Sequence, residues 1–106
     1  MGSLDYVSNP ADLPPETLSQ LFLTAVEDCR EELAFRYFPG DGDHLEDMSY
    51  GAVYELVRIV SGGLQALGMK RGDRAAILSE TRMEWSVCDY ACICTGVLDV
   101  PIYSTL

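Results

Sequence analysis

Cysteine and histidine are the residues of this sequence whose types and spacing first suggest chemistry. Cys88 and Cys92 are four residues apart in an apolar segment, so on a helix their thiols would share a face, and Cys94 follows closely. Thiolates and imidazoles are the ligands that zinc prefers. Cys94, however, would point to another face, and the single histidine, His44, lies in a distant acidic stretch. We therefore interpret the cysteines as reduced core thiols and predict no metal ligand among them.

Two other stretches resemble binding loops but are better explained as structure. Asp41-Gly42-Asp43 begins like a calcium loop, yet Glu46 stands where glycine is needed and Ala52 where the bidentate glutamate belongs. Three glycines near the middle of the chain suggest a nucleotide loop: Gly62, Gly63 and Gly68. They lack the G-x-G-x-x-G spacing and fall inside or at the end of an expected helix. No residue is therefore predicted to be catalytic, to bind a cofactor or to hold a metal.

The charge of the chain is strongly negative and unevenly distributed. The formal net charge is −10, and the part up to Asp47 carries eleven acidic residues against two basic ones. Such a balance argues against nucleic acid and against electrostatic docking on anionic lipid. No signal peptide is visible, and Asp89 and Asp99 interrupt the one long apolar run. We expect a cytoplasmic protein, and leave open whether a longer parent chain attaches peripherally to membranes.

The first half of the chain predicts two amphipathic helices. Residues 1–13 read as a polar lead-in, and 14–106 as one incomplete domain portion. Apolar residues recur in steps of three and four from Leu18 to Cys29, which predicts a helix. A short strand at 33–38, a turn at 40–44 and an extended piece at 45–48 follow. Ser49 can cap a second helix that ends before Gly68.

The second half predicts a parallel βαβ unit in an α/β fold. A strand is expected at about 74–80, a helix at about 83–95 and a strand at about 97–103, joined by short connections. Such a unit should have a right-handed crossover. The helix is apolar on almost every side, and parallel strands need cover on both faces. Because 106 residues can hardly supply that cover, we expect the chain to be part of something larger, and to self-associate when isolated.

Several stretches resemble the early part of the AMP-forming acyl-CoA synthetase (acyl-adenylate-forming) family. They are "MSYGAVYELV", "GGLQALGMKRGDRAAILSETRMEW" and "GVLDVPIYSTL", with a weaker upstream match in "ETLSQLFLTAVEDCREELAFRY". Their order and spacing carry the resemblance, which covers about residue 12 to the end. The segments "SETRMEW" and "IYSTL" are similar to those of the long-chain fatty acyl branch of the family. The chain departs from the family pattern at Thr81, Met83, Asp99 and Ser104, which affects turns more than identity.

The resemblance implies what a full-length parent would do and which parts are missing here. Such ligases join a carboxylic acid to ATP, release pyrophosphate and pass the acyl group from AMP to coenzyme A. The parent is therefore expected to use fatty acid, ATP, Mg²⁺ and coenzyme A, none of them bound by this segment. Lys70 is the only lysine and lies in an expected turn, so it is not assigned the family's catalytic lysine.

Two functions remain open from the sequence. In the first, the chain is the N-terminal structural segment of a long-chain fatty acid–CoA ligase, and its partner is the rest of that ligase. In the second, it is a stand-alone truncated interaction or regulatory module without catalysis. An independent nucleotide-binding domain is disfavoured, because the glycine loop that would hold the phosphates is absent.

Overall fold

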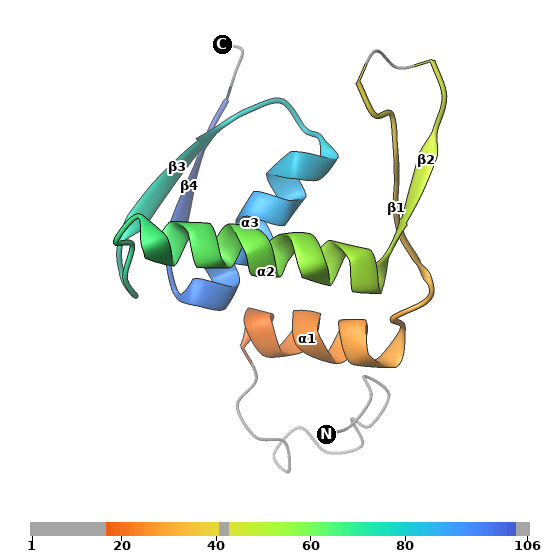
Figure 1. Cartoon of the computed structure of the whole chain (residues 1–106). Coiled ribbons are helices and arrows are strands. Elements are labelled where there is room, and N and C mark those ends of the chain that lie inside the picture. Colours follow the sequence, from red (N-terminus) through yellow and green to blue (C-terminus); the bar gives the residue numbers. More distant parts are fainter. Residues whose placement is uncertain (1–16, 41–42, 104–106) are drawn as a thin grey trace, which may run out of the picture.

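The computed structural model describes residues 17–40 and 43–103, and the predicted lead-in at 1–13 lies outside this part. Within it, helices and strands follow one another in an α/β arrangement (Figure 1). The elements are α1 (Leu18–Asp28), β1 (Leu33–Tyr37), β2 (Glu46–Ser49), α2 (Tyr50–Ala66), β3 (Arg74–Leu78), α3 (Met83–Thr95) and β4 (Leu98–Ile102). The α/β fold class is thus confirmed.

Helix α1 begins where the sequence supplies a capping box. Thr17 Oγ1 accepts a hydrogen bond from the backbone N–H of Gln20 at 3.2 Å, and Gln20 Oε1 accepts one from the N–H of Thr17 at 2.9 Å. Two of the N–H groups that a helix start leaves unpaired are satisfied in this way. Phe22 and Val26 of the predicted apolar stripe are buried, whereas Leu18 at the start of the stripe is 65% exposed.

Strands β1 and β2 form an antiparallel hairpin, as the short strand and extended piece predict. Arg36 faces Asp47 across the pair, and the guanidinium Nε lies 2.8 Å from Asp47 Oδ1. Both side chains are more than half exposed, so the ion pair contributes little stability. The hairpin and the second sheet lie at opposite ends of α2 (Figure 1). Residues 41–42 of the predicted turn are outside the described part.

Helix α2 has the ends that its sequence predicts. Ser49 Oγ accepts a hydrogen bond from the N–H of Ala52 at 3.2 Å, so Ser49 is the N-cap. The helix ends at Ala66, and Gly68 follows with φ +91°, a conformation that glycine adopts without steric cost. Gly62 and Gly63 lie inside the helix, as expected.

The predicted parallel βαβ unit is present, with strands shorter than expected. Strand β3 ends at Leu78 instead of residue 80, and β4 covers Leu98–Ile102 instead of 97–103. The ladder runs from the Arg74–Leu98 pair to the Leu78–Ile102 pair. Val97 is not in β4 because its N–H bonds to the Cys92 carbonyl at 2.9 Å and so still completes the end of α3.

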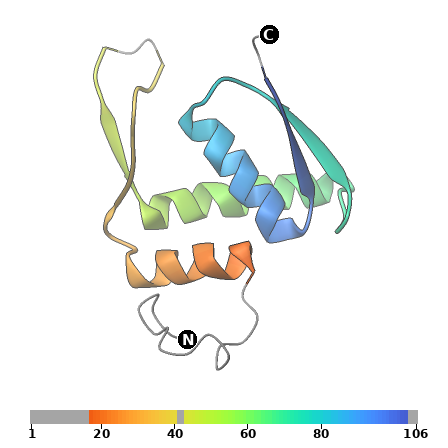
Figure 2. The same ribbon diagram turned by 180° about the vertical axis from the view of Figure 1, so that it is seen from behind.

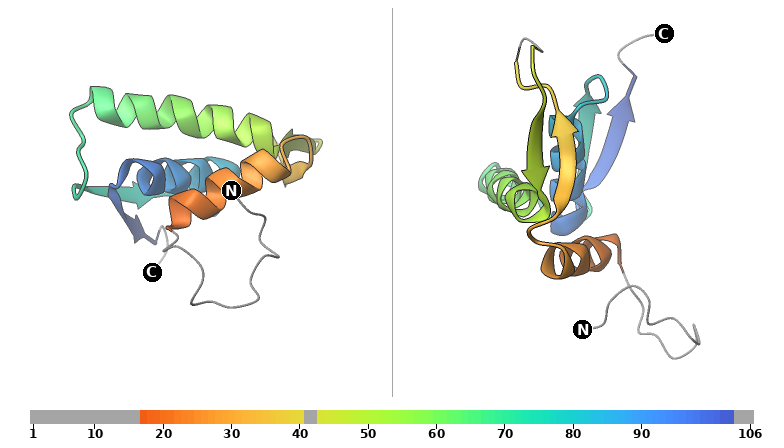
Figure 3. Two further views of the ribbon diagram at one scale, coloured as in Figure 1. Left: turned by 90° about the horizontal axis from the view of Figure 1, so that it is seen from below. Right: turned by 90° about the vertical axis from the view of Figure 1, so that its right-hand side faces the viewer.

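The core lies where the three helices meet. It consists of six buried residues: Phe22, Val26, Val53, Val57, Val87 and Ala91. The ring of Phe22 stacks on Tyr90 with centroids 4.4 Å apart, which joins α1 to α3. Helix α3 crosses α2 (Figure 2) and lies between α2 and the β3–β4 sheet (Figure 3). No helix in the described part is both long and apolar enough to cross a bilayer.

Candidate functional site

The β3–β4 sheet has one face against α3 and one face without cover. Exposure alternates along β3, where Ala75 and Ile77 are half-buried and their neighbours are exposed. In β4 the exposed residues Leu98 and Val100 flank the half-buried Asp99. We call the uncovered side the outer face; its apolar residues are Ala76, Leu78, Leu98, Val100 and Ile102. A parallel sheet is normally covered on both faces, so this one is incomplete as it stands.

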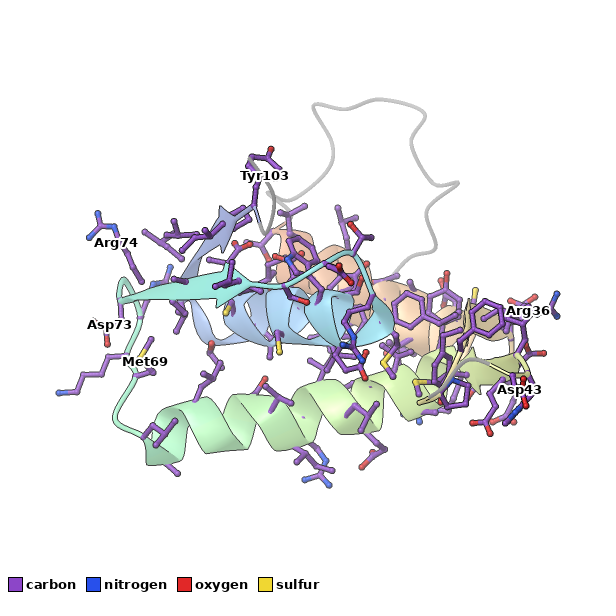
Figure 4. The ribbon with its side chains drawn as sticks, turned by 90° about the horizontal axis from the view of Figure 1, so that it is seen from above. Arg36, Asp43, Met69, Asp73, Arg74 and Tyr103 are labelled. Atoms are coloured by element: carbon purple, nitrogen blue, oxygen red, sulfur yellow. The ribbon has the colours of Figure 1, made fainter. Side chains whose placement is uncertain are left out.

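The outer face is apolar to an extent unusual for a surface exposed to water. Leu78 is 67% exposed and Leu98 52% exposed, and the register places Leu78 beside Ile102. Arg74 and Tyr103, at opposite ends of the sheet, both point away from the helices (Figure 4). Aliphatic side chains of this kind can bury against another layer of structure but cannot move protons or bind phosphate. We therefore take the outer face as a candidate packing surface.

The three cysteines of the apolar segment behave as core residues. Cys92 is buried, and Cys88 and Cys94 are half-buried on α3. Burial raises the pKa of the Cys92 thiol, and nearby Asp99 adds to that effect; burial likewise raises the pKa of Cys94. Thiols with raised pKa values stay protonated and are poor metal ligands and poor nucleophiles. Their assignment to the core agrees with this geometry.

His44 is placed on the hairpin, away from α3. Its Nε2 atom lies 3.3 Å from Glu46 Oε2, and both side chains are largely exposed. The structure therefore does not bring the histidine together with the cysteines. Across residues 17–40 and 43–103, no group of three or more metal-ligating side chains occurs. The suspected calcium loop includes residues 41–42, which lie outside the described part.

An open cavity of about 400 Å³ lies between α1, α2 and the end of α3. Its lining includes Phe22, Tyr54, Val57, Ser61 and Thr95. Ser61 Oγ is buried and has no hydrogen-bond partner among the described residues. Arg58 also lines the cavity, but its guanidinium is bonded to Glu55 at 3.0 Å. Among the described residues, the lining contains no carboxylate and no histidine that could act as the acid or base of a group transfer.

Two acidic side chains, Asp89 and Asp99, are partly buried, which the sequence alone does not reveal. Asp89 of α3 and Asp99 of β4 are both half-buried and interact with each other. Burial, followed by the hydrogen bond and the charge of Asp99, raises the pKa of Asp89 to about 6. In the sequence both residues stand out as charges that interrupt an apolar run, and Asp99 also as a departure from the family pattern. The signal that could identify them is the position of Asp99 on the inward side of an alternating strand.

Comparisons with known proteins identify the family. The sequence model of a family described as "AMP-binding enzyme" matches residues 22–106. The long-chain-fatty-acid–CoA ligase ACSBG2 of Xenopus laevis is 37% identical over 98 residues, which are 92% of this chain and 13% of that protein. The long-chain-fatty-acid–CoA ligase FadD15 of Mycobacterium bovis is 39% identical over 59 residues, 56% of this chain and 10% of that protein. The chain thus spans about a tenth of the length of these relatives.

Solved structures of the same kind share the fold. The fatty acid AMP ligase of Legionella pneumophila superposes with a TM-score of 0.75 at 21% identity, over 91% of this chain and 16% of that one. The N-terminal subdomain of Klebsiella oxytoca NpsA gives a TM-score of 0.74 at 20% identity, over 87% of this chain and 23% of that one. The resemblance inferred from the sequence motifs is therefore confirmed, and the chain belongs to the AMP-binding enzyme family.

Proposed function

We propose that this chain is the N-terminal structural segment of an ATP-dependent long-chain fatty acid–CoA ligase. Such an enzyme converts fatty acid, ATP and coenzyme A into acyl-CoA, AMP and pyrophosphate through an acyl-adenylate. The observation that carries the proposal is the match over 92% of this chain to a relative named as a long-chain-fatty-acid–CoA ligase. FadD15 carries the same description, which supports the long-chain branch over other AMP-binding enzymes.

The role of the segment in that enzyme is to supply a scaffold. The outer face of β3–β4 gives it an apolar surface that a further layer of the same ligase can cover. In the part of the chain that the structure describes, each sheet has only two strands, so its edges can pair with further strands. The domain portion 14–106 would thus be completed by the rest of the ligase chain, its principal partner.

The chemistry belongs to other parts of the ligase. Attack on the α-phosphate of ATP requires Mg²⁺ and hydrogen-bond donors around the polyphosphate. The described residues do not fit a magnesium site, because they contain no group of three candidate ligands. Lys70 lies in the turn before β3, where Asp73 Oδ2 accepts a hydrogen bond from its N–H at 2.7 Å. We therefore assign no step of the reaction to this segment.

Fatty-acid-dependent ATP–pyrophosphate exchange tests the scaffold role. The purified chain should show no exchange above background with palmitate or oleate, whereas the full-length Xenopus ligase, run in parallel, is the positive control. Exchange by the chain alone that persists after contaminating enzymes have been removed would show that the chain carries catalytic groups. That result would overturn the scaffold role. The alternative, a stand-alone interaction module, also predicts no ATP–pyrophosphate exchange. A chimaera with a full-length ligase distinguishes the two, because only a structural segment would support the activity of the rest.

A further inference from the structure

A tight turn joins α1 to β1 and lies across the first turn of α2. We call this turn, residues 29–32, the strap. The N–H of Glu32 donates a hydrogen bond to the carbonyl of Cys29 at 2.9 Å, which closes the strap on itself. Because a turn closed in this way has a defined backbone conformation, its other carbonyl groups point in fixed directions. The strap can therefore present them to a neighbouring element without rearranging.

Two carbonyl groups of the strap accept hydrogen bonds from the start of α2. The N–H of Tyr50 donates to the carbonyl of Glu32 at 3.0 Å. The N–H of Gly51 donates to the carbonyl of Arg30 at 2.9 Å. The first N–H groups of a helix have no partner inside the helix, so they need acceptors from elsewhere. The strap supplies two of these acceptors, in addition to the side-chain cap that precedes α2.

The side chain of Arg30 lies along the same face of α2. Its guanidinium carbon is 5.7 Å from the centre of the Tyr54 ring, within the range of a cation–π contact. Gly51 and Tyr54 are three residues apart and so share a face of the helix. A Cβ added to Gly51 would lie 2.9 Å from Arg30 Cγ and 3.2 Å from the Arg30 carbonyl oxygen. The flexible side chain can move away, but the carbonyl is held by its hydrogen bond. Glycine at this position therefore allows the strap to approach α2 closely.

The strap is continuous with the base of the β1–β2 hairpin. Strand β1 begins at Leu33, directly after the strap, and β2 ends at Ser49, directly before α2. Leu33 and Ser49 are partners in the ladder. The hydrogen bond between Tyr50 and Glu32 therefore extends the pairing of the two strands onto the helix. The hairpin projects from this end of α2 (Figure 1), so the strap fixes its base.

The other attachments of the hairpin to the helices are small. In the described part, it packs against the core through three half-buried residues: Ala34, Phe35 and Met48. The ion pair of Arg36 with Asp47 joins the two strands to each other and not to a helix. Helix α1 has an anchor of its own, the aromatic stack on α3. Opening of the strap would therefore release the hairpin and leave the three helices packed together.

We propose that the strap is a conformational lock that holds the hairpin against α2 and opens together with it. The strap and the hairpin form one cooperative unit, which opens while the βαβ unit stays closed. Segments with little buried apolar surface open at a lower free energy than the core, and contiguous hydrogen-bonded segments open together. The lock sets the direction in which the hairpin projects from α2. It is a property of the fold of this chain and does not depend on the proposed role in a ligase.

Native-state hydrogen exchange followed by NMR tests the lock in the whole chain. In the wild type, the amide of Tyr50 should have the same opening equilibrium constant as the hydrogen-bonded amides of the hairpin. This constant should exceed that of the β3–β4 ladder by about tenfold or more. Gly51→Ala should accelerate exchange at Tyr50 and in the hairpin by about tenfold, because the added methyl group crowds the strap. Exchange in the β3–β4 ladder should not change.

Two further variants separate the close approach from other effects. Gly63→Ala is the matched control, since Gly63 lies in the same helix with open space around its Cα, and it should not accelerate exchange in the hairpin. Arg30→Ala removes the cation–π contact but keeps the carbonyl. It should accelerate exchange at Tyr50 and in the hairpin by about threefold, less than Gly51→Ala does.

Three results would overturn the proposal. The first is a wild-type opening constant at Tyr50 that differs from that of the hairpin, because the two would then open separately. The second is a Gly51→Ala chain whose exchange at Tyr50 is unchanged. The third is equal acceleration in the hairpin and in the β3–β4 ladder by Arg30→Ala, which would mean that the whole fold is loosened. The wild-type comparison needs no substitution, so it decides the question even if Gly51→Ala prevents folding.

Discussion

At the scale of single residues, Gly96 shows that a glycine can be required by the backbone conformation and not by a bound ligand. Gly96 has φ +74° and ends α3, and its N–H bonds to the carbonyls of Cys92 and Ile93. An added Cβ would lie 2.9 Å from Arg71 Cγ, which belongs to a flexible side chain and can move. The strained backbone conformation therefore decides the cost of a substitution there, more than the contact with Arg71.

Gly96→Ala should lower the free energy of unfolding by about 1 kcal/mol, because alanine is disfavoured at positive φ. Gly62→Ala is the matched control, since Gly62 lies inside α2 with open space around its Cα. This second change should raise stability by up to about 1 kcal/mol through helix propensity. Urea denaturation followed by circular dichroism measures both. Equal effects of the two substitutions would contradict the strain assigned to Gly96.

The same scale shows what the sequence could not reveal about Asp89 and Asp99. Helical period and strand alternation place each residue on its element, but the distance between them depends on how α3 lies on β4. That packing is a long-range property, and no local pattern specifies it. The cysteines were easier to interpret, because their apolar neighbours already indicate burial.

At the scale of elements, the helices could be predicted well and the strand ends less well. The boundaries of α3 agree with the prediction because Gly96 stops the helix by its own conformation. Strand β3 stops two residues early, since the ladder requires a partner and β4 ends at Ile102. Strand ends depend on a neighbouring strand, whereas helix ends depend mainly on local caps.

Ser49→Ala tests whether the cap predicted from the sequence stabilises α2. The hydroxyl accepts a hydrogen bond from the N–H of Ala52, and its loss should cost about 1 kcal/mol of stability. Ser49→Asp keeps an acceptor and should retain most of the wild-type stability. Chemical denaturation of the three chains checks this. If alanine and aspartate destabilise the chain equally, the side-chain cap does not contribute.

At the scale of the whole molecule, the uncovered outer face is the main departure from a self-sufficient domain. The core is small and lies among the helices, while aliphatic residues of β3 and β4 remain in water. A layer supplied by the rest of a ligase would cover them. The family could be predicted because several short motifs occur in a fixed order; the uncovered face could be predicted because a parallel sheet needs two covering layers.

We expect the isolated chain to self-associate through this face at micromolar concentration. Val100→Asp places a charge at the centre of the outer face and should shift the chain toward the monomer. Ile59→Asp changes an exposed aliphatic residue on α2, 60% exposed against 42% for Val100, and should leave the association unchanged. Sedimentation velocity measures all three chains. A wild-type chain that stays monomeric would contradict self-association through the outer face. An effect of Ile59→Asp as large as that of Val100→Asp would contradict it as well.

The most direct test of the central claim is a chimaera of the Xenopus ligase. Its segment matched over 98 residues is replaced by the corresponding residues of this chain, and palmitate-dependent ATP–pyrophosphate exchange and acyl-CoA formation are measured. If the chain is the structural segment of such a ligase, the chimaera should fold and retain both activities within about tenfold of the parent, about 1.4 kcal/mol in barrier height. A chimaera that fails to fold, or that folds and has no activity, would contradict the claim and favour a stand-alone module.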